Sequence, residues 1–263
     1  MAIKSKISWT DATVNFWTGC AKVSEACKFC YMYRDMTRFK KDPQLLNRTS
    51  DATFYKPLKW KQPKRIFTCS WSDFFIEDAD PWRSDAWQVI KDTPQHTWII
   101  LTKRPERIRE CLPSDWGDGY HNVWIGVTAE NQDRLKERLP YLVNIPAKVR
   151  FLSIEPILGA VDLFDKELTK MVEQLHWIIV GGESGNETGK FLYRSSELNW
   201  YRSLVVQAKT LSLPVFVKQI GTFLAKEAKL KGDRHGSKLE SLPKSLQYRE
   251  FPTPRTDKQL KFF

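Results

Sequence analysis

Three cysteines, Cys20, Cys27 and Cys30, lie in one short segment of the chain. Thiolates are the ligands of iron–sulfur clusters, and a [4Fe–4S] cube normally takes four of them. A segment that supplies only three would leave one iron free to bind a small molecule. Phe29 directly precedes Cys30, so its ring would lie beside that molecule. The spacing therefore predicts a [4Fe–4S] cluster held by Cys20, Cys27 and Cys30, with Phe29 in the cofactor site.

Zinc and disulfides are the alternatives for these cysteines. A structural zinc site usually takes four ligands from two paired clusters, but the chain has no second Cys-x-x-Cys pair, and its histidines are scattered: His96, His121, His176 and His235. Five cysteines is an odd number, no secretory signal precedes them, and the composition is typical of an intracellular protein, in which thiols stay reduced. We interpret Cys69 and Cys111 as buried structural residues.

Short apolar runs alternate with polar loops and amphipathic stretches along the chain. Strands that alternate with helical patterns indicate a parallel sheet, which right-handed crossovers curl. We therefore predict an α/β fold, a full or partial (β/α) barrel over residues 1–220. A basic C-terminal extension, residues 221–263, is expected on or near the barrel rim, either as a cap or as a mobile loop. Seven runs are candidate strands: Thr13 to Trp17, Arg65 to Cys69, Thr97 to Leu101, Asn122 to Val127, Val149 to Ile154, His176 to Val180 and Pro214 to Val217.

Polar residues follow most of these runs, at the strand ends where parallel barrels carry their reactive groups. Charges gathered at the rim of an apolar barrel are costly unless they pair or bind something. The cluster therefore indicates a binding site, or a salt-bridge network that closes the barrel. Candidate cofactor-binding residues are Ser70, Ser72, Asp73, Glu130, Glu155, Gly181, Gly182 and Glu183, and candidate substrate-binding residues are Lys103, Arg104 and Lys218.

The cysteine loop resembles that of the radical S-adenosylmethionine (SAM) superfamily, whose usual pattern is C-x3-C-x-aromatic-C; here six residues separate the first two cysteines. More narrowly, the chain resembles a family of phage and bacterial proteins that is catalogued as a domain of unknown function and grouped with the radical SAM barrels. The resemblance implies a barrel whose cluster chelates the amino and carboxylate groups of SAM. It rests on the cysteine loop and five further segments: Ile7–Asn15, Ser70–Asp73, Leu101–Arg107, Ser153–Gly159 and Val180–Gly185.

The resemblance also suggests roles for the polar residues. By position, Ser70, Ser72 and Asp73 would accept hydrogen bonds from the SAM ammonium. The two glycines Gly181 and Gly182 would let backbone amides approach a ligand, and Glu183 would hold a ribose or the substrate. Glu130 and Glu155 would bind ribose hydroxyls of SAM or the substrate, or pair with Lys103 and Arg104. Lys103 and Arg104 would bind phosphate or carboxylate groups, or belong to a solvated face.

The chain is strongly basic, with 42 Lys and Arg against 31 Asp and Glu, a formal charge of +11 and a pI near 9.4. Such an excess favours polyanionic partners. Eleven tryptophans would suit base stacking, although Trp98, Trp124 and Trp177 would equally pack in the core. No apolar run reaches the roughly 18 residues of a membrane span, so no membrane partner is expected.

The sequence thus predicts a cytoplasmic, bacterial or phage-encoded radical SAM enzyme. It would take an electron from a donor, cleave SAM to a 5′-deoxyadenosyl radical and modify or repair nucleic acid or a nucleotide. One alternative is a nucleic-acid-binding protein with a structural or redox-sensing cluster. Another is a SAM-binding enzyme that cleaves a different bond or uses polar chemistry.

Overall fold

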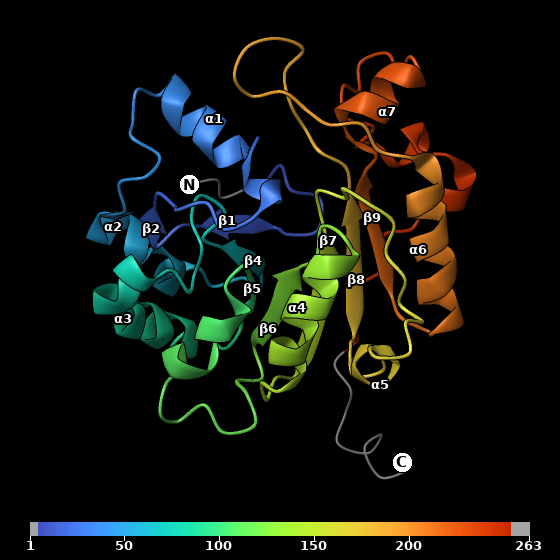
Figure 1. The fold of residues 1–263 in the computed structure, drawn as a ribbon. Helices are drawn as coiled ribbons and strands as arrows, with labels where there is room; N and C mark the ends of the chain where they lie inside the picture. Colours follow the sequence, from blue (N-terminus) through green and yellow to red (C-terminus); the bar gives the residue numbers. More distant parts are fainter. Residues whose placement is uncertain (1–4, 254–263) are drawn as a thin grey trace.

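The computed structural model describes residues 5–253, and its centre is a sheet of seven parallel strands in chain order. All seven predicted runs overlap one of its strands. The first and last strands do not pair with each other, so the sheet is curled but open. The predicted α/β fold is therefore confirmed as a partial barrel (Figure 1). The strands are β1 (Ala12–Val14), β4 (Arg65–Thr68), β5 (Thr97–Thr102), β6 (Val123–Thr128), β7 (Val149–Ile154), β8 (Trp177–Gly181) and β9 (Val215–Gln219).

Helices and short helical turns connect these strands, and α4 and α6 lie against β6 and β8–β9, respectively (Figure 1). A small antiparallel pair, β2 (Trp17–Thr18) and β3 (Asn47–Arg48), lies outside the main sheet. None of the helices in the described part of the chain has the length and apolarity that a membrane crossing requires. The α-helices are α1 (Tyr31–Arg38), α2 (Asp51–Phe54), α3 (Asp80–Lys91), α4 (Gln132–Val143), α5 (Thr169–Val172), α6 (Leu198–Thr210) and α7 (Gly221–Glu227). The 3₁₀ turns are η1 (Glu25–Cys27), η2 (Lys56–Lys59), η3 (Glu77–Ala79), η4 (Pro105–Arg107), η5 (Arg109–Cys111), η6 (Leu239–Ser241) and η7 (Lys244–Leu246).

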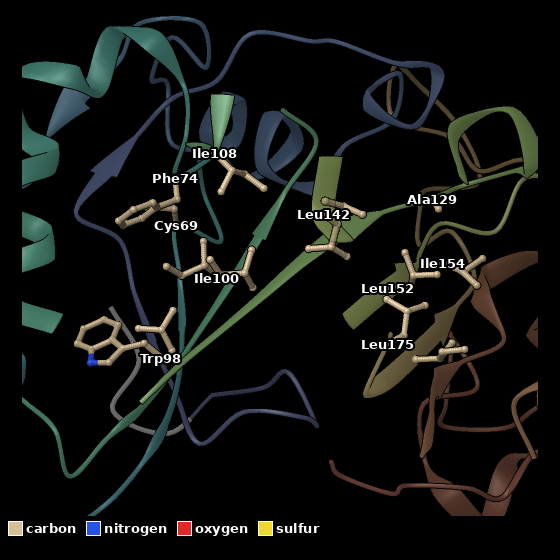
Figure 2. Close-up of a cluster of buried hydrophobic side chains, with 14 of the residues drawn as sticks. Cys69, Phe74, Trp98, Ile100, Ile108, Ala129, Leu142, Leu152, Ile154 and Leu175 are labelled. Atoms are coloured by element: carbon tan, nitrogen blue, oxygen red, sulfur yellow. The ribbon is translucent and has the colours of Figure 1, made fainter. Parts of the chain in front are cut away.

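Both faces of the sheet are buried, which explains why its strands are continuous apolar runs. Alternate residues of a strand point to opposite faces. On the outer face, Ile100 and Leu152 belong to a cluster that also contains Leu142 of α4 (Figure 2). The inner face is lined by a second cluster, rich in aromatic side chains, that fills the partial barrel: Phe67, Trp124, Phe151, Trp177 and Phe216. The core interpretation of Trp98, Trp124 and Trp177 is confirmed, since all three are buried.

The C-terminal segment covers the edge strand β9. The Val217 amide donates to the Tyr248 carbonyl (2.9 Å), and the Glu250 amide donates to the Val215 carbonyl (3.1 Å). Covering an edge in this way prevents it from pairing with another chain. The predicted division into a barrel and an extension stays a prediction, and residues 254–263 lie outside the described residues.

A buried aspartate organises the turn that precedes this segment. The Asp233 carboxylate accepts hydrogen bonds from the amides of Ser237 and Lys238, both at 2.8 Å. Burial opposes the charge, but these hydrogen bonds outweigh it and lower the pKa of Asp233 to about 2. The turn is therefore most stable with this carboxylate ionised.

We predict that Asp233→Asn lowers the free energy of unfolding by about 2 kcal/mol at pH 7. A carboxylate whose pKa is depressed in the native state stabilises that state at pH values above its pKa in the unfolded chain. That contribution is complete above the ordinary pKa of 3.8 and is lost as the pH falls towards about 2. Urea unfolding of both proteins between pH 7 and pH 3 checks this. A difference that stays constant as the pH falls below 3.8 would contradict the assignment.

The packing of the inner core can be tested at Gly126. A Cβ at this position would lie 2.5 Å from the Phe151 ring, whereas one at Gly159 would lie an ordinary 3.5 Å from the Asn131 Cβ. Because overpacked cores lose about 1–3 kcal/mol, Gly126→Ala should be destabilised by that amount. Gly159→Ala is the control, with an expected change within about 0.5 kcal/mol. Equal denaturation midpoints for the two variants would argue against a close-packed barrel interior.

Candidate functional site

The cysteine loop lies at the carboxyl ends of the first strands. The Gly19 amide donates to the Trp71 carbonyl (3.0 Å), just after β4, and Ser72 Oγ donates to the Gly19 carbonyl (2.5 Å). After β5, Arg104 donates to the Ala21 carbonyl (2.9 Å). Figure 1 shows α1, which follows the loop, at the same end of the molecule as α7 and the long loop between β8 and α6. The loop therefore covers the end of the barrel where the sequence predicts the site.

The three thiols of this loop are close enough to influence one another. Burial raises the pKa of Cys20 to about 12, and Cys27 adds to the rise at both Cys20 and Cys30. The pKa of Tyr33 is also raised to about 12, first by burial and then by all three cysteines. Three thiols on one loop are the type of ligand that an iron–sulfur cluster takes.

Two cations accompany the thiols. Arg104 Nη1 lies 3.7 Å from Cys20 Sγ, and Lys103 lowers the pKa of Cys30 against the larger effect of burial. Positive groups stabilise thiolates, so the surroundings fit an anionic cluster. Within residues 5–253, however, no three Cys, His, Asp or Glu side chains are already arranged to hold a metal ion. The thiols would have to reorient to bind one.

Charged and polar groups on α4 and at its start anchor the loop. Glu25 accepts hydrogen bonds from Arg134 Nη2 (3.0 Å) and from Asn131 Nδ2 (2.7 Å). Ser24 Oγ donates to the Glu130 carboxylate. Because these contacts precede Cys27 and Cys30 directly, they fix the position of the second half of the loop.

Glu130 is itself one of the most deeply buried charges of the protein. The exposed fraction is 0% for Glu130 and 2% for Arg138, and Arg138 Nη1 lies 2.8 Å from Glu130 Oε2. Arg138 also donates to the Thr128 carbonyl (2.9 Å). Both carboxylate oxygens of Glu130 thus have protein partners, and the cation that pairs with Glu130 is Arg138, not the predicted Lys103 or Arg104. The predicted cofactor contact of Glu130 stays a prediction.

The carboxylate of Asp73 also has several partners within the protein. It accepts hydrogen bonds from Thr102 Oγ1 (2.7 Å) and from the amides of Phe75 and Lys103, both at 2.9 Å. Arg104 Nη1 lies 3.4 Å away. These contacts join the segments that follow β4 and β5 beneath the cysteine loop. An ammonium of SAM would have to compete with them.

Ser70 and Arg104, two further predicted site residues, also contact other parts of the protein. Ser70 Oγ donates to Asn15 Oδ1 (3.3 Å), and the Ser70 carbonyl accepts from the Tyr31 hydroxyl (2.6 Å). Arg104, which the sequence assigns to the substrate, is 8% exposed and is turned towards Cys20 and Asp73. Arg104 therefore belongs to the surroundings of the cysteine loop, and the predicted substrate contacts of Lys103 and Arg104 stay a prediction.

A partly exposed ion pair lies at the mouth of the barrel. Lys218 Nζ is 2.5 Å from Glu155 Oε1, and the side chains are 21% and 18% exposed. Lys218 lies at an irregularity of β9, since Val217 pairs with Val180 and Gln219 with Gly181, and the contact with Glu155 fixes the direction of its side chain. β8 separates the two strands that carry the pair, and a Cβ on Gly181 would lie 2.8 Å from the Glu155 carboxyl carbon. Gly181 thus makes room for this pair.

The loop between β8 and α6 clamps the cysteine loop from the other side. Arg194 donates to the Glu183 carboxylate through Nε (2.9 Å) and to the Glu25 carbonyl through Nη1 (2.9 Å). Its guanidinium also lies 5.5 Å from the centroid of the Phe29 ring. Gly182 is needed for packing, because a Cβ there would meet the Ile220 carbonyl at 2.4 Å. The sequence gives no signal for Arg194, which is far from Glu25 along the chain.

The chain belongs to the family described as "Protein of unknown function (DUF5131)", whose model matches residues 4–252. No curated protein matches it. Among solved structures it is similar to a spore photoproduct lyase mutant with bound AdoMet and dinucleoside spore photoproduct, with 14% sequence identity and a TM-score of 0.46. The similarity covers 78% of this chain and 63% of that one, so this chain spans less than two thirds of the lyase's length.

The burial of Glu130 leads to a stability prediction. Glu130→Gln leaves Arg138 buried without a counter-charge, so the free energy of unfolding should fall by about 3–5 kcal/mol. Glu25→Gln is the matched control, since Glu25 pairs with Arg134 at the surface and should cost no more than about 1 kcal/mol. Chemical denaturation measures both.

A second variant keeps this test readable if Glu130→Gln fails to fold. Glu130→Gln with Arg138→Met removes both charges and should recover much of the lost stability. Equal losses for Glu25→Gln and Glu130→Gln would show that Glu130 is not a structural charge.

Proposed function

We propose that the protein is a radical SAM enzyme that acts on nucleic acid or a nucleotide. The observation that carries this proposal is that the loop with Cys20, Cys27 and Cys30 lies at the carboxyl end of a partial parallel barrel. Three thiols fit a [4Fe–4S] cluster with one iron open to a ligand. When bound, that cluster would supply the electron, received from an external donor, that cleaves SAM to a 5′-deoxyadenosyl radical.

The residues around the loop would prepare the site for this chemistry. Arg104 and Lys103 would offset the negative charge of the thiolates. Arg194 holds the Phe29 ring and the Glu25 backbone, so Phe29 would form one wall of the SAM site. The partly buried positions of Cys20 and Cys30 would limit the access of water.

Glu155 and Lys218 are the members of the predicted site that reach the barrel mouth as a partly exposed pair. We propose that Glu155 binds a hydroxyl or the ammonium of SAM, while Lys218 turns to an anionic substrate group. Ser70, Ser72, Asp73, Gly181, Gly182 and Glu183 would support the SAM site chiefly through the contacts described above. The formal charge of +11 supports a phosphorylated substrate.

We predict that Cys20→Ala, Cys27→Ala and Cys30→Ala each remove most of the iron from anaerobically reconstituted protein, because each deletes one of three protein ligands. Cys69→Ala and Cys111→Ala are matched controls and should retain the iron, since both thiols are buried elsewhere. Iron and sulfide analysis measures the result. Retention of iron by the three variants, or loading with zinc alone, would overturn the proposed centre.

The reaction itself is tested on the loaded protein with SAM and a strong reductant. Formation of 5′-deoxyadenosine is expected, and the three cysteine variants should not produce it. A cluster that forms without any cleavage of SAM would instead favour a nucleic-acid-binding protein with a structural or redox-sensing cluster.

A further inference from the structure

A pocket of about 520 Å³ lies beside the cysteine loop, between α1, the loop after β8 and the turn after α7. None of the residues predicted from the sequence as site residues lines it. Its polar lining includes Arg34, Arg38, Arg234, His235, Asn186 and Asp35. A larger hollow of about 630 Å³ lies between α3 and residues 107–120, away from this loop.

The pocket is positively charged, with three arginines against one carboxylate. Among residues 5–253, Arg34 pairs with a carboxylate only at Asp35, through Nε at 3.4 Å, which leaves its two terminal nitrogens available. Arg234 uses Nη2 to donate to the Gly185 carbonyl (2.8 Å). Within residues 5–253, Arg38 makes no side-chain hydrogen bond or ion pair. Since Arg34 and Arg38 are four residues apart on α1, they share one face of the helix.

His235 adds a directed donor to this pocket. Its Nδ1 lies 2.8 Å from Thr222 Oγ1, and Thr222 Oγ1 already accepts from the Gly185 amide (3.1 Å). The hydroxyl can donate its proton to Nδ1, and with that arrangement we assign the ring proton to Nε2. Burial lowers the pKa of His235, and Arg234, Arg34 and Lys218 lower it further, against the opposing effect of Asp233. The same positive charges that disfavour a protonated His235 favour a bound anion.

We propose that this pocket binds a phosphate group of the substrate, through the arginine side chains of α1 and Arg234 and through His235. Guanidinium groups match phosphate oxygens in pairs. This inference rests on the proposed function, whose substrate it narrows to one that carries a phosphate. Arg34 stands about one helical turn, or ~5 Å, beyond the start of α1, which directly follows Cys30. A phosphate held there would leave its sugar and base close to the barrel mouth.

The test compares two double variants. One is Arg38→Gln/Arg234→Gln, which removes two arginines of the pocket, and the control is Arg109→Gln/Arg202→Gln. All four arginines are exposed, and both double variants remove the same charge. Binding of a fluorescent single-stranded oligonucleotide to the reconstituted protein is measured by anisotropy in a salt series. The pocket variant should bind about tenfold more weakly, with a salt slope reduced by about 0.7 for each phosphate that is no longer neutralised. The control should change less than twofold.

Unlabelled AMP and inorganic phosphate distinguish the sources of the phosphate. If the pocket variant loses oligonucleotide affinity, the phosphate belongs to a polymer; if it loses AMP affinity alone, the phosphate belongs to a mononucleotide. Arg38→Gln alone should show the same trend, and this variant removes no interaction on which folding depends. Affinities for oligonucleotide, AMP and phosphate equal to those of the parent, or an equal loss in the control, would overturn the proposal. Because the readout is binding, it is independent of SAM cleavage, whose failure would overturn only the radical mechanism.

Discussion

The ion pair between Glu130 and Arg138 is the contact on which the geometry of the site depends. A carboxylate with no exposed surface is tolerated only if it is paired and hydrogen-bonded. Glu130 follows β6, Arg138 lies on α4, and the third partner is Ser24 of the cysteine loop. Any displacement of the loop would leave part of this charge unsatisfied. The cost of burying one carboxylate thus ties the loop to the barrel wall.

The loop is held against three further parts of the barrel rim. Ser72 and Arg104 bind its first half, after β4 and β5, and Arg194 binds its second half from the loop after β8. The cysteine side chains make few such contacts, so the loop backbone is fixed while the thiols can still turn. This combination suits a site whose ligands reorient when a cluster is inserted. It also explains how three thiols on one loop can coexist with the lack of a preformed metal geometry in the described residues.

The strands could be predicted from the sequence because they are buried on both faces and therefore appear as continuous apolar runs. Whether the barrel closes could not be predicted from the sequence, since closure depends on the short β1 and on the C-terminal segment that covers β9. At the site, the rim position of Asp73 and Glu130 was predictable, but their partners were not. Thr102 and Arg138 are ordinary residues in sequence, and only the fold brings them to these carboxylates. The spacing of Arg34 and Arg38 was a visible helical signal that a search limited to strand ends overlooks.

The distribution of cations at the rim follows from these pairings. Arg104 contacts Cys20 and Asp73, so it can balance the negative charge of the proposed cluster. Two anions held close together repel each other unless each has its own counter-charges. The structure provides such a division, with Arg104 and Lys103 near the thiols and the α1 arginines around the neighbouring pocket. Lys218, which lowers the pKa of His235 from the barrel mouth, connects the two regions. A phosphorylated substrate could therefore be held beside the proposed cluster while each anion keeps its own set of cations.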